Sequence, residues 1–119
     1  MHCRHKRKVT LVMNEKFTKL KDLLKEGLTG YPVKKTILFG SQVNGNSDEQ
    51  SDFDILILVD DSLQTAAYNE LKFSIHKLLI DSSFKYPVDL IVKHESAFET
   101  ERHVFGALAY RVCREGIVL

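Results

Sequence analysis

The chain of 119 residues lacks the features that mark several common classes of protein. Its two cysteines, Cys3 and Cys113, are too few to staple a small fold and lack CxxC spacing, so we expect both to be free thiols. The longest unbroken aliphatic run, Ile55 to Val59, is far below the roughly 20 residues of a membrane helix. Val9 to Met13 is too short for the hydrophobic part of a secretory signal. These absences argue against a disulfide scaffold and a membrane protein, and they predict a cytoplasmic location.

The glycines match none of the common nucleotide- or calcium-binding motifs. There is no GxGxxG, and Gly40 and Gly45 have P-loop spacing but are followed by Asn46-Ser47 instead of Lys-Ser/Thr. An EF-hand loop fails because Ile55-Leu56 occupies positions that should be polar.

Positive charge is concentrated at the start of the chain. The formal net charge is +1, but without residues 1–12 the chain has 13 basic against 16 acidic side chains. Because the remaining body is acidic, nucleic acid is not its expected partner. We interpret residues 1–12 as a basic, disordered extension in front of a domain spanning residues 13–119, with Met13 as the natural start. A basic arm for nucleic acid and a metal site of His2, Cys3 and His5 are the alternatives.

Hydrophobic periodicity from residue 14 onward predicts one α/β domain built around a small sheet. The first predicted segments are a helix through Phe17, Leu20, Leu24 and Leu28, a strand at Thr36–Phe39, and a strand at Phe53–Val59. The later ones are a helix at Thr65–Ile80, a strand at Tyr86–Val92, a helix at Ser96–Arg114, and an extended tail after Gly116. The strand at Phe53–Val59 is apolar on both faces and should be central and covered. The apolar face of the last helix, with Phe98 and Phe105, is either core or a partner surface.

Two carboxylates stand at the entry of the central strand. Asp52 and Asp54 are two residues apart, so both side chains should leave the same face and repel unless a cation lies between them. The preceding strand runs into Gly40-Ser41, where a glycine without a Cβ lets phosphates approach and a turn can aim N–H groups at an anion. Paired carboxylates beside a phosphate cradle suit Mg²⁺-assisted phosphoryl chemistry. A solvated Asp pair at a strand end is the alternative.

A third carboxylate, Asp89, lies in the apolar segment Val88–Val92, which we expect to be buried. A buried carboxylate without a partner would cost several kcal/mol. A neighbouring strand that presents Asp52 and Asp54 with a divalent ion would remove that cost. The alternative is a structural carboxylate that is hydrogen-bonded or paired with a lysine.

Gly40-Ser41 followed after ten residues by Asp52-x-Asp54 resembles the GS-x10-DxD signature of the DNA polymerase β-like nucleotidyltransferase superfamily. The closer pattern, with Gly45 and Ser51, is similar to the minimal nucleotidyltransferases, which include the antitoxins of HEPN–MNT toxin–antitoxin modules. The resemblance covers most of residues 13–119. It implies a single-domain nucleotidyltransferase fold, in which helices flank a small mixed sheet and the active site lies at one sheet end.

The resemblance also implies an activity and its residues. Gly40 and Ser41 would hold the triphosphate, Asp52 and Asp54 would bind two Mg²⁺ ions, and Asp89 would share one and help activate the acceptor. The reaction would transfer AMP from ATP to a hydroxyl, such as a tyrosine of a HEPN toxin, with this chain acting as an antitoxin and associating with itself or its partner.

Some residues leave the function open. Gln42, Val43 and Asn44 stand where many minimal members carry arginines, so the loop has little charge for a triphosphate. The sequence does not say whether the lysines near strand ends, Lys34, Lys35 and Lys93, supply it, or whether His94-Glu95 borders the site. The alternative functions are a module that neutralises its partner by contact alone and a transferase for a small molecule such as an aminoglycoside.

Overall fold

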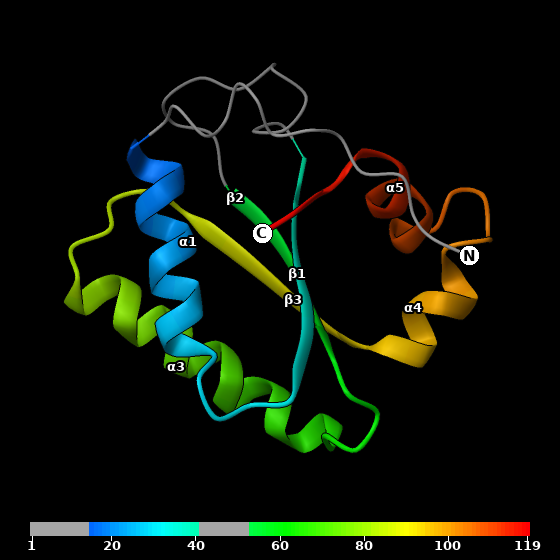
Figure 1. Cartoon of the computed structure of the whole chain (residues 1–119), viewed down its shortest axis with the longest axis horizontal. Coiled ribbons are helices and arrows are strands. Elements are labelled where there is room, and N and C mark those ends of the chain that lie inside the picture. The colour runs from blue at the N-terminus through cyan, green and yellow to red at the C-terminus, as the bar shows by residue number, and fades with distance from the viewer. Residues whose placement is uncertain (1–14, 41–52) are drawn as a thin grey trace.

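The computed structural model describes residues 15–40 and 53–119, which form a four-stranded sheet with helices on both faces (Figure 1). The strands are β1 (Val33–Phe39), β2 (Phe53–Val59), β3 (Val88–His94) and β4 (Ile117–Val118). The helices are α1 (Glu15–Gly27), the 3-10 turn η2 (Thr65–Ala67), α3 (Tyr68–Asp81), α4 (Glu95–Glu101) and α5 (Leu108–Glu115). The predictions made for residues 1–12 concern residues outside these described ranges.

The sheet is mixed, with strand order β3-β2-β1-β4. β1 is antiparallel to both β2 and β4, whereas β2 and β3 are parallel and are joined through α3. The central, covered position expected for Phe53–Val59 is confirmed, because β2 lies between β1 and β3 and its last five residues, Ile55 to Val59, are all buried. The fold is the small single-domain, mixed-sheet fold that the resemblance implies.

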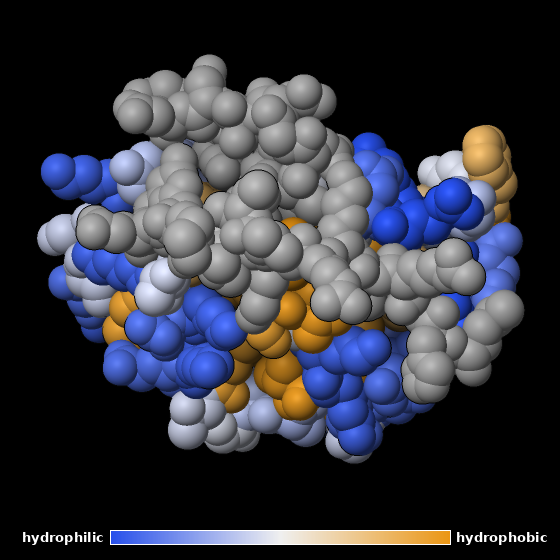
Figure 2. All heavy atoms as spheres, turned by 45° about the horizontal axis from the view of Figure 1, so that its top comes forward, coloured by the Kyte–Doolittle hydropathy of each residue, from blue (hydrophilic) through white to orange (hydrophobic). Residues whose placement is uncertain are grey.

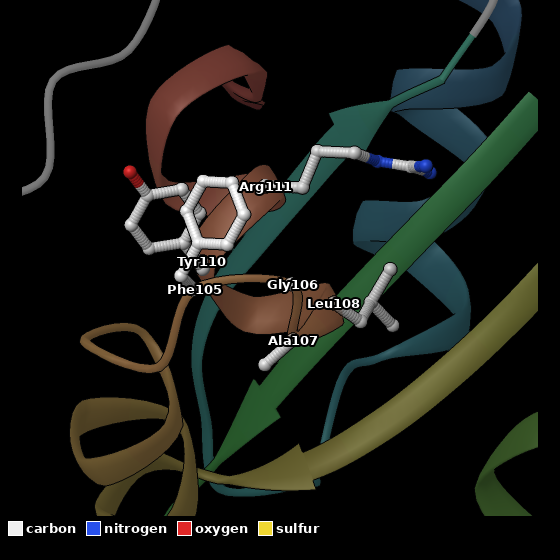
Figure 3. Close-up of a pocket in the computed structure, with 6 residues that line it drawn as sticks. All are labelled: Phe105, Gly106, Ala107, Leu108, Tyr110 and Arg111. Carbon is white, nitrogen blue, oxygen red and sulfur yellow. The ribbon is translucent and has the colours of Figure 1, made fainter.

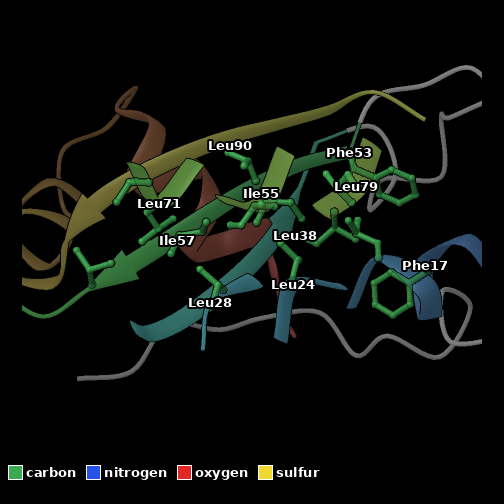
Figure 4. Packing of buried hydrophobic residues seen from close by; sticks show 14 residues of the cluster. Phe17, Leu24, Leu28, Leu38, Phe53, Ile55, Ile57, Leu71, Leu79 and Leu90 are labelled. Carbon is green, nitrogen blue, oxygen red and sulfur yellow. The ribbon is translucent and has the colours of Figure 1, made fainter. Parts of the chain in front are cut away.

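The two sheet faces carry separate hydrophobic clusters, because side chains along a strand alternate between faces. On one face, α1 and α3 pack over Ile55 and Ile57 of β2, as Figure 4 shows. On the other face, α4 and α5 pack over Leu56 and Leu58. Asp54 has the parity of Leu56, so its side chain leaves the sheet on the α4/α5 face.

The single helix expected at Ser96–Arg114 is wrong, because the chain forms two helices with a break between Glu101 and Leu108. Gly106 in the break has φ +91°, which a helix does not allow. As a result Phe98 is buried, while Phe105 is 86% exposed. The predicted face is therefore divided: Phe98 belongs to the core and Phe105 to the surface.

The state of Cys113 and the lengths of the helices bear on the predictions of free thiols and of a protein without a membrane helix. Cys113 is disulfide-bonded in the structure, so the free thiol expected there is wrong, and Cys3 lies outside the described residues. Over the ranges 15–40 and 53–119, no helix is long and apolar enough to cross a membrane. In Figure 2, hydrophilic residues flank a central group of hydrophobic ones on the face shown.

Asp61 fixes the start of α4 from a distant loop, and this gives a pH prediction. The Asp61 carboxyl accepts hydrogen bonds from the Ser96 hydroxyl and from the Ser96 backbone N–H, which lies 3.1 Å from Asp61 Oδ1. These hydrogen bonds hold the pKa of the Asp61 carboxyl below its usual 3.8. A lowered folded-state pKa adds stability above pH 3.8 that is lost as pH falls through the folded value. We expect Asp61→Ala to lower Tm at pH 7, with the difference from wild type shrinking below about pH 4. Asp61→Asn, which keeps an acceptor oxygen, should lose less; a difference in Tm that does not change down to pH 2 would contradict this role.

Candidate active site

Asp54 and Asp89 lie side by side at one end of the sheet. They are paired positions in the parallel register of β2 and β3, each the second residue of its strand. Neighbouring strands are about 4.8 Å apart, and paired residues point to the same face. The structure therefore brings together two of the three carboxylates predicted from the sequence, on the α4/α5 face.

Gly40 completes this end of the sheet and is fitted to Asp54. It follows Phe39, which pairs with Asp54 across β1 and β2, and its φ is +87°. A Cβ on Gly40 would overlap Asp54 Oδ2 and lie 3.2 Å from Asp54 Cγ. The space beside this glycine, expected to admit phosphates, is thus occupied by the Asp54 carboxylate.

The starts of β2 and β3 are held in register beneath the two carboxylates. The Phe53 N–H donates to the Pro87 carbonyl oxygen at 2.9 Å, one residue before Asp54 on β2 and two residues before Asp89 on β3. On the opposite face, the Phe53 ring lies 6.0 Å from that of Phe84 and 6.4 Å from that of Tyr86. These contacts hold the starts of β2 and β3 together and so set the spacing of the Asp54 and Asp89 backbones.

Asp89 differs from its expected environment. The sequence predicts burial, but β3 is an edge strand of the sheet, and Asp89 near its start is exposed. The desolvation cost expected of a buried Asp89 therefore does not arise, and this argument for a cation is wrong. What remains is the pairing with Asp54 itself, since two carboxylates at paired positions repel.

The chemistry of this pair fits a magnesium ion, because carboxylate oxygens are the ligands that Mg²⁺ prefers. Within the described ranges no group of three His, Cys, Asp or Glu side chains could hold a metal. Asp52 and Ser41, the other predicted site residues, lie outside those ranges. The described part of the chain thus supplies two carboxylates of the predicted three, together with Gly40.

The strand lysines considered as a source of positive charge lie at the other end of the sheet. Lys35 and Lys93 both pair with Leu58, four residues or about 13 Å along the strand from Asp54. Lys34 contacts Asp60 at 3.5 Å, and Lys93 contacts Glu101 at 2.9 Å. These side chains therefore do not serve the candidate site.

His94 and Glu95 are also remote from it. His94 pairs with Val59 at the far end of β2, and its Nε2 is hydrogen-bonded to the Leu63 carbonyl oxygen. Its ring packs edge-on against Tyr68 at 5.4 Å. The idea that His94-Glu95 borders the site is therefore wrong, and His94 has a structural role before α4.

Comparison with known proteins identifies the class to which this fold and site belong. The polymerase β nucleotidyltransferase family model matches residues 18–119. Because the match covers most of the chain, the protein belongs to this family of nucleotidyltransferases. No curated protein matches the chain significantly.

The chain is similar to proteins in solved structures, among them the following two. The crystal structure of a toxin–antitoxin with AMP-PNP has a TM-score of 0.50 and 23% identity, covering 88% of this chain and 72% of that one. Spectinomycin adenyltransferase AAD(9) from Enterococcus faecialis, solved with ATP and spectinomycin, has a TM-score of 0.48 and 25% identity. There the match covers 69% of this chain and 34% of the adenyltransferase, so this chain spans about a third of that protein.

Proposed function

We propose that this nucleotidyltransferase transfers AMP from ATP, with Mg²⁺, to a hydroxyl of a partner protein, and that the partner is a HEPN toxin which it neutralises as an antitoxin. The observation that carries the proposal is the pairing of Asp54 with Asp89 beside Gly40. Two carboxylates held at one spacing on neighbouring strands are suited to metal-assisted transfer of a phosphoryl group.

The reaction makes one bond and breaks one. The acceptor oxygen loses its proton and bonds to the α-phosphorus of ATP, while the bond from that phosphorus to the bridging oxygen breaks and pyrophosphate leaves. Asp54 and Asp89, together with Asp52, would hold Mg²⁺, which supplies electrostatic stabilisation of the attacking and leaving oxygens. Asp89, at the more exposed position, is open to an acceptor hydroxyl and would help to remove its proton.

A protein acceptor is supported by the surface beside α5. Phe105 is 86% exposed, and its ring lies 5.3 Å from that of Tyr110, at the rim of a hollow of about 440 Å³ (Figure 3). Exposed aromatic side chains of this kind are typical of protein contacts. The toxin–antitoxin structure with AMP-PNP is a relative in fold and supports the same choice of partner.

The proposal is tested by following label from ATP carrying ³²P at the α-phosphate. The full chain is incubated with Mg²⁺ and the toxin encoded beside its gene. We expect label on the toxin with wild type, its loss on adding EDTA, and no label with the Asp52→Ala/Asp54→Ala double variant. Equal labelling by wild type and the double variant would refute catalysis at this site.

Neutralisation by contact alone is the second candidate, and one observation favours it. Residues 41–52 contain no lysine or arginine that would attract a triphosphate. If the Asp52→Ala/Asp54→Ala variant still neutralises the toxin and wild type consumes no ATP, the binding-module function replaces the catalytic one.

A further inference from the structure

The candidate active site needs positive charge that the loop and the strands do not supply. Residues 41–52 have no lysine or arginine, and the strand lysines lie at the other end of the sheet. A nucleoside triphosphate carries several negative charges on its phosphates, and proteins bind such groups with arginine, lysine and N–H donors. A cation from another part of the chain is therefore expected near Asp54 and Asp89.

Helix α5 lies on the same sheet face as Asp54 and runs toward the same end. Its Val112 is fully buried in the cluster that contains Ile37 and Phe39 of β1. Gly116, just after the helix, lies against β1, since a Cβ there would be 3.4 Å from the Leu38 carbonyl oxygen. The helix thus ends beside Leu38 of β1, two residues before Gly40.

Arg111 projects from the flank of α5 that faces the central strand. It is three residues after Leu108, so the two side chains share a flank of the helix. Leu108 packs against the cluster that includes Leu56 and Leu58 of β2, and in Figure 3 it lies over that strand. In Figure 3, Arg111 extends over the sheet toward the end of β1, whereas Phe105 lies on the other side of α5.

The guanidinium of Arg111 is exposed and forms no ion pair with any residue in the described ranges. The other arginines of this region are engaged. Arg102 is buried and its Nε donates to Glu99 Oε2 at 2.9 Å, while Arg114 lies 5.6 Å from the centre of the Tyr110 ring. Arg111 is therefore the cation of α5 that remains available to a ligand.

We propose that Arg111 binds the phosphate chain of the nucleoside triphosphate whose α-phosphate lies at Asp54 and Asp89; this inference rests on the proposed function. A guanidinium donates two parallel N–H bonds to phosphate oxygens and stays charged at every working pH. Arg111 compensates for the missing loop arginines: the positive charge comes from α5, across the sheet face, instead of from the segment after Gly40.

The test is the affinity of the full chain for α,β-methylene-ATP with Mg²⁺, by titration calorimetry, because this analogue cannot be cleaved at the α–β bridge. We expect Arg111→Ala to raise Kd at least about tenfold, because losing a hydrogen bond to a charged group costs at least that much affinity. Arg111→Lys should restore part of the lost affinity. Binding of adenosine should change less than about twofold. The matched control is Arg114→Ala, which removes a charge from the same helix at a guanidinium that lies 5.6 Å from the centre of the Tyr110 ring, and its Kd should stay within about twofold of wild type.

The outcomes separate this inference from the proposed function. If wild type binds the analogue and Arg111→Ala binds it equally well, Arg111 has no such role, although the proposed function stands. Lys85, the exposed lysine in the segment before β3, is the rival cation, and a loss of affinity in Lys85→Ala alone would transfer the role to it. If wild type binds no nucleoside triphosphate with Mg²⁺, both proposals fail.

Discussion

Replacing Asp89 by asparagine is expected to lower nucleotidyl transfer at least about 100-fold while leaving the fold intact. Loss of a group that only supports a metal ligand already costs about 10–100-fold, so loss of a proposed ligand should cost at least that much. Asparagine has nearly the same shape, and Asp89 is exposed, so the side chain has no packing to lose. The measurement is the initial rate of transfer of α-phosphate label to the acceptor at saturating Mg²⁺.

The same substitution should make the metal-free protein slightly more stable. Asp54 and Asp89 are paired across β2 and β3, and like charges at such positions destabilise a sheet. Removing one charge is expected to raise the free energy of unfolding by about 0.2–1 kcal/mol, measured by urea denaturation with EDTA at low salt. If Asp89→Asn gains stability and loses activity, the Asp89 carboxylate serves the reaction and not the stability of the fold.

The control for Asp89 is Asp81→Asn, which also removes an exposed carboxylate. Asp81 lies on α3, on the opposite face of the sheet, and pairs with Lys77 at 3.2 Å. An exposed pair of this kind contributes little, so we expect unchanged activity and a stability within about 0.5 kcal/mol of wild type. If Asp89→Asn retained activity like this control, Asp89 would not belong to the site.

Added Mg²⁺ gives a second readout on the same variants. A ligand that binds only the native state stabilises it by RT ln(1 + [L]/Kd), so Tm rises with the ligand concentration. Wild type and Asp81→Asn should therefore gain Tm with rising Mg²⁺, and Asp89→Asn should gain clearly less. Identical gains in all three proteins would show that the ion does not bind at Asp89.

The sequence predicted those parts of the fold that local pattern determines. The uninterrupted apolar run of β2 indicated a covered central strand, and Gly27 and Gly30 indicated the end of α1. It failed where tertiary placement decides. The spacing of Phe98 and Phe105 is helical, but the break at Gly106 puts them in different environments.

For the candidate site, the sequence predicted the juxtaposition of Asp54 and Asp89 but not their surroundings. Strand order and direction are long-range properties, so the exposure of Asp89 on an edge strand could not be read from its apolar neighbours. For the same reason the sequence did not say whether Lys93 reaches the site, and the parallel pairing now places it about 13 Å along the strand from Asp54. Arg111 gave no signal at all, because only the packing of α5 relates it to this sheet end.

Gly40 allows the geometry of the site to be tested without touching a charge. Gly40→Ala places a methyl group where Asp54 Oδ2 now lies, so the carboxylate has to move. A displacement of about 1 Å in a reacting group can cost about 100-fold in rate, and we expect a loss of that order. The φ of +87° adds backbone strain, for which we expect a loss of about 1–2 kcal/mol in the free energy of unfolding.

Gly30→Ala separates the two effects, because the strain is the same and the clash is absent. Gly30 has φ +93°, and an added Cβ would meet nothing within 4 Å. Both variants should therefore lose about 1–2 kcal/mol by urea denaturation, but only Gly40→Ala should lose transfer activity and the gain in Tm with Mg²⁺. If the two variants were equally active at a temperature where both are folded, the position of the Asp54 carboxylate would not matter for the reaction. The Gly40→Ala variant also distinguishes two roles for this glycine. If the glycine leaves room for the Asp54 carboxylate, transfer activity and Mg²⁺ binding should fall together. If it leaves room for the nucleotide, only nucleotide binding should fall.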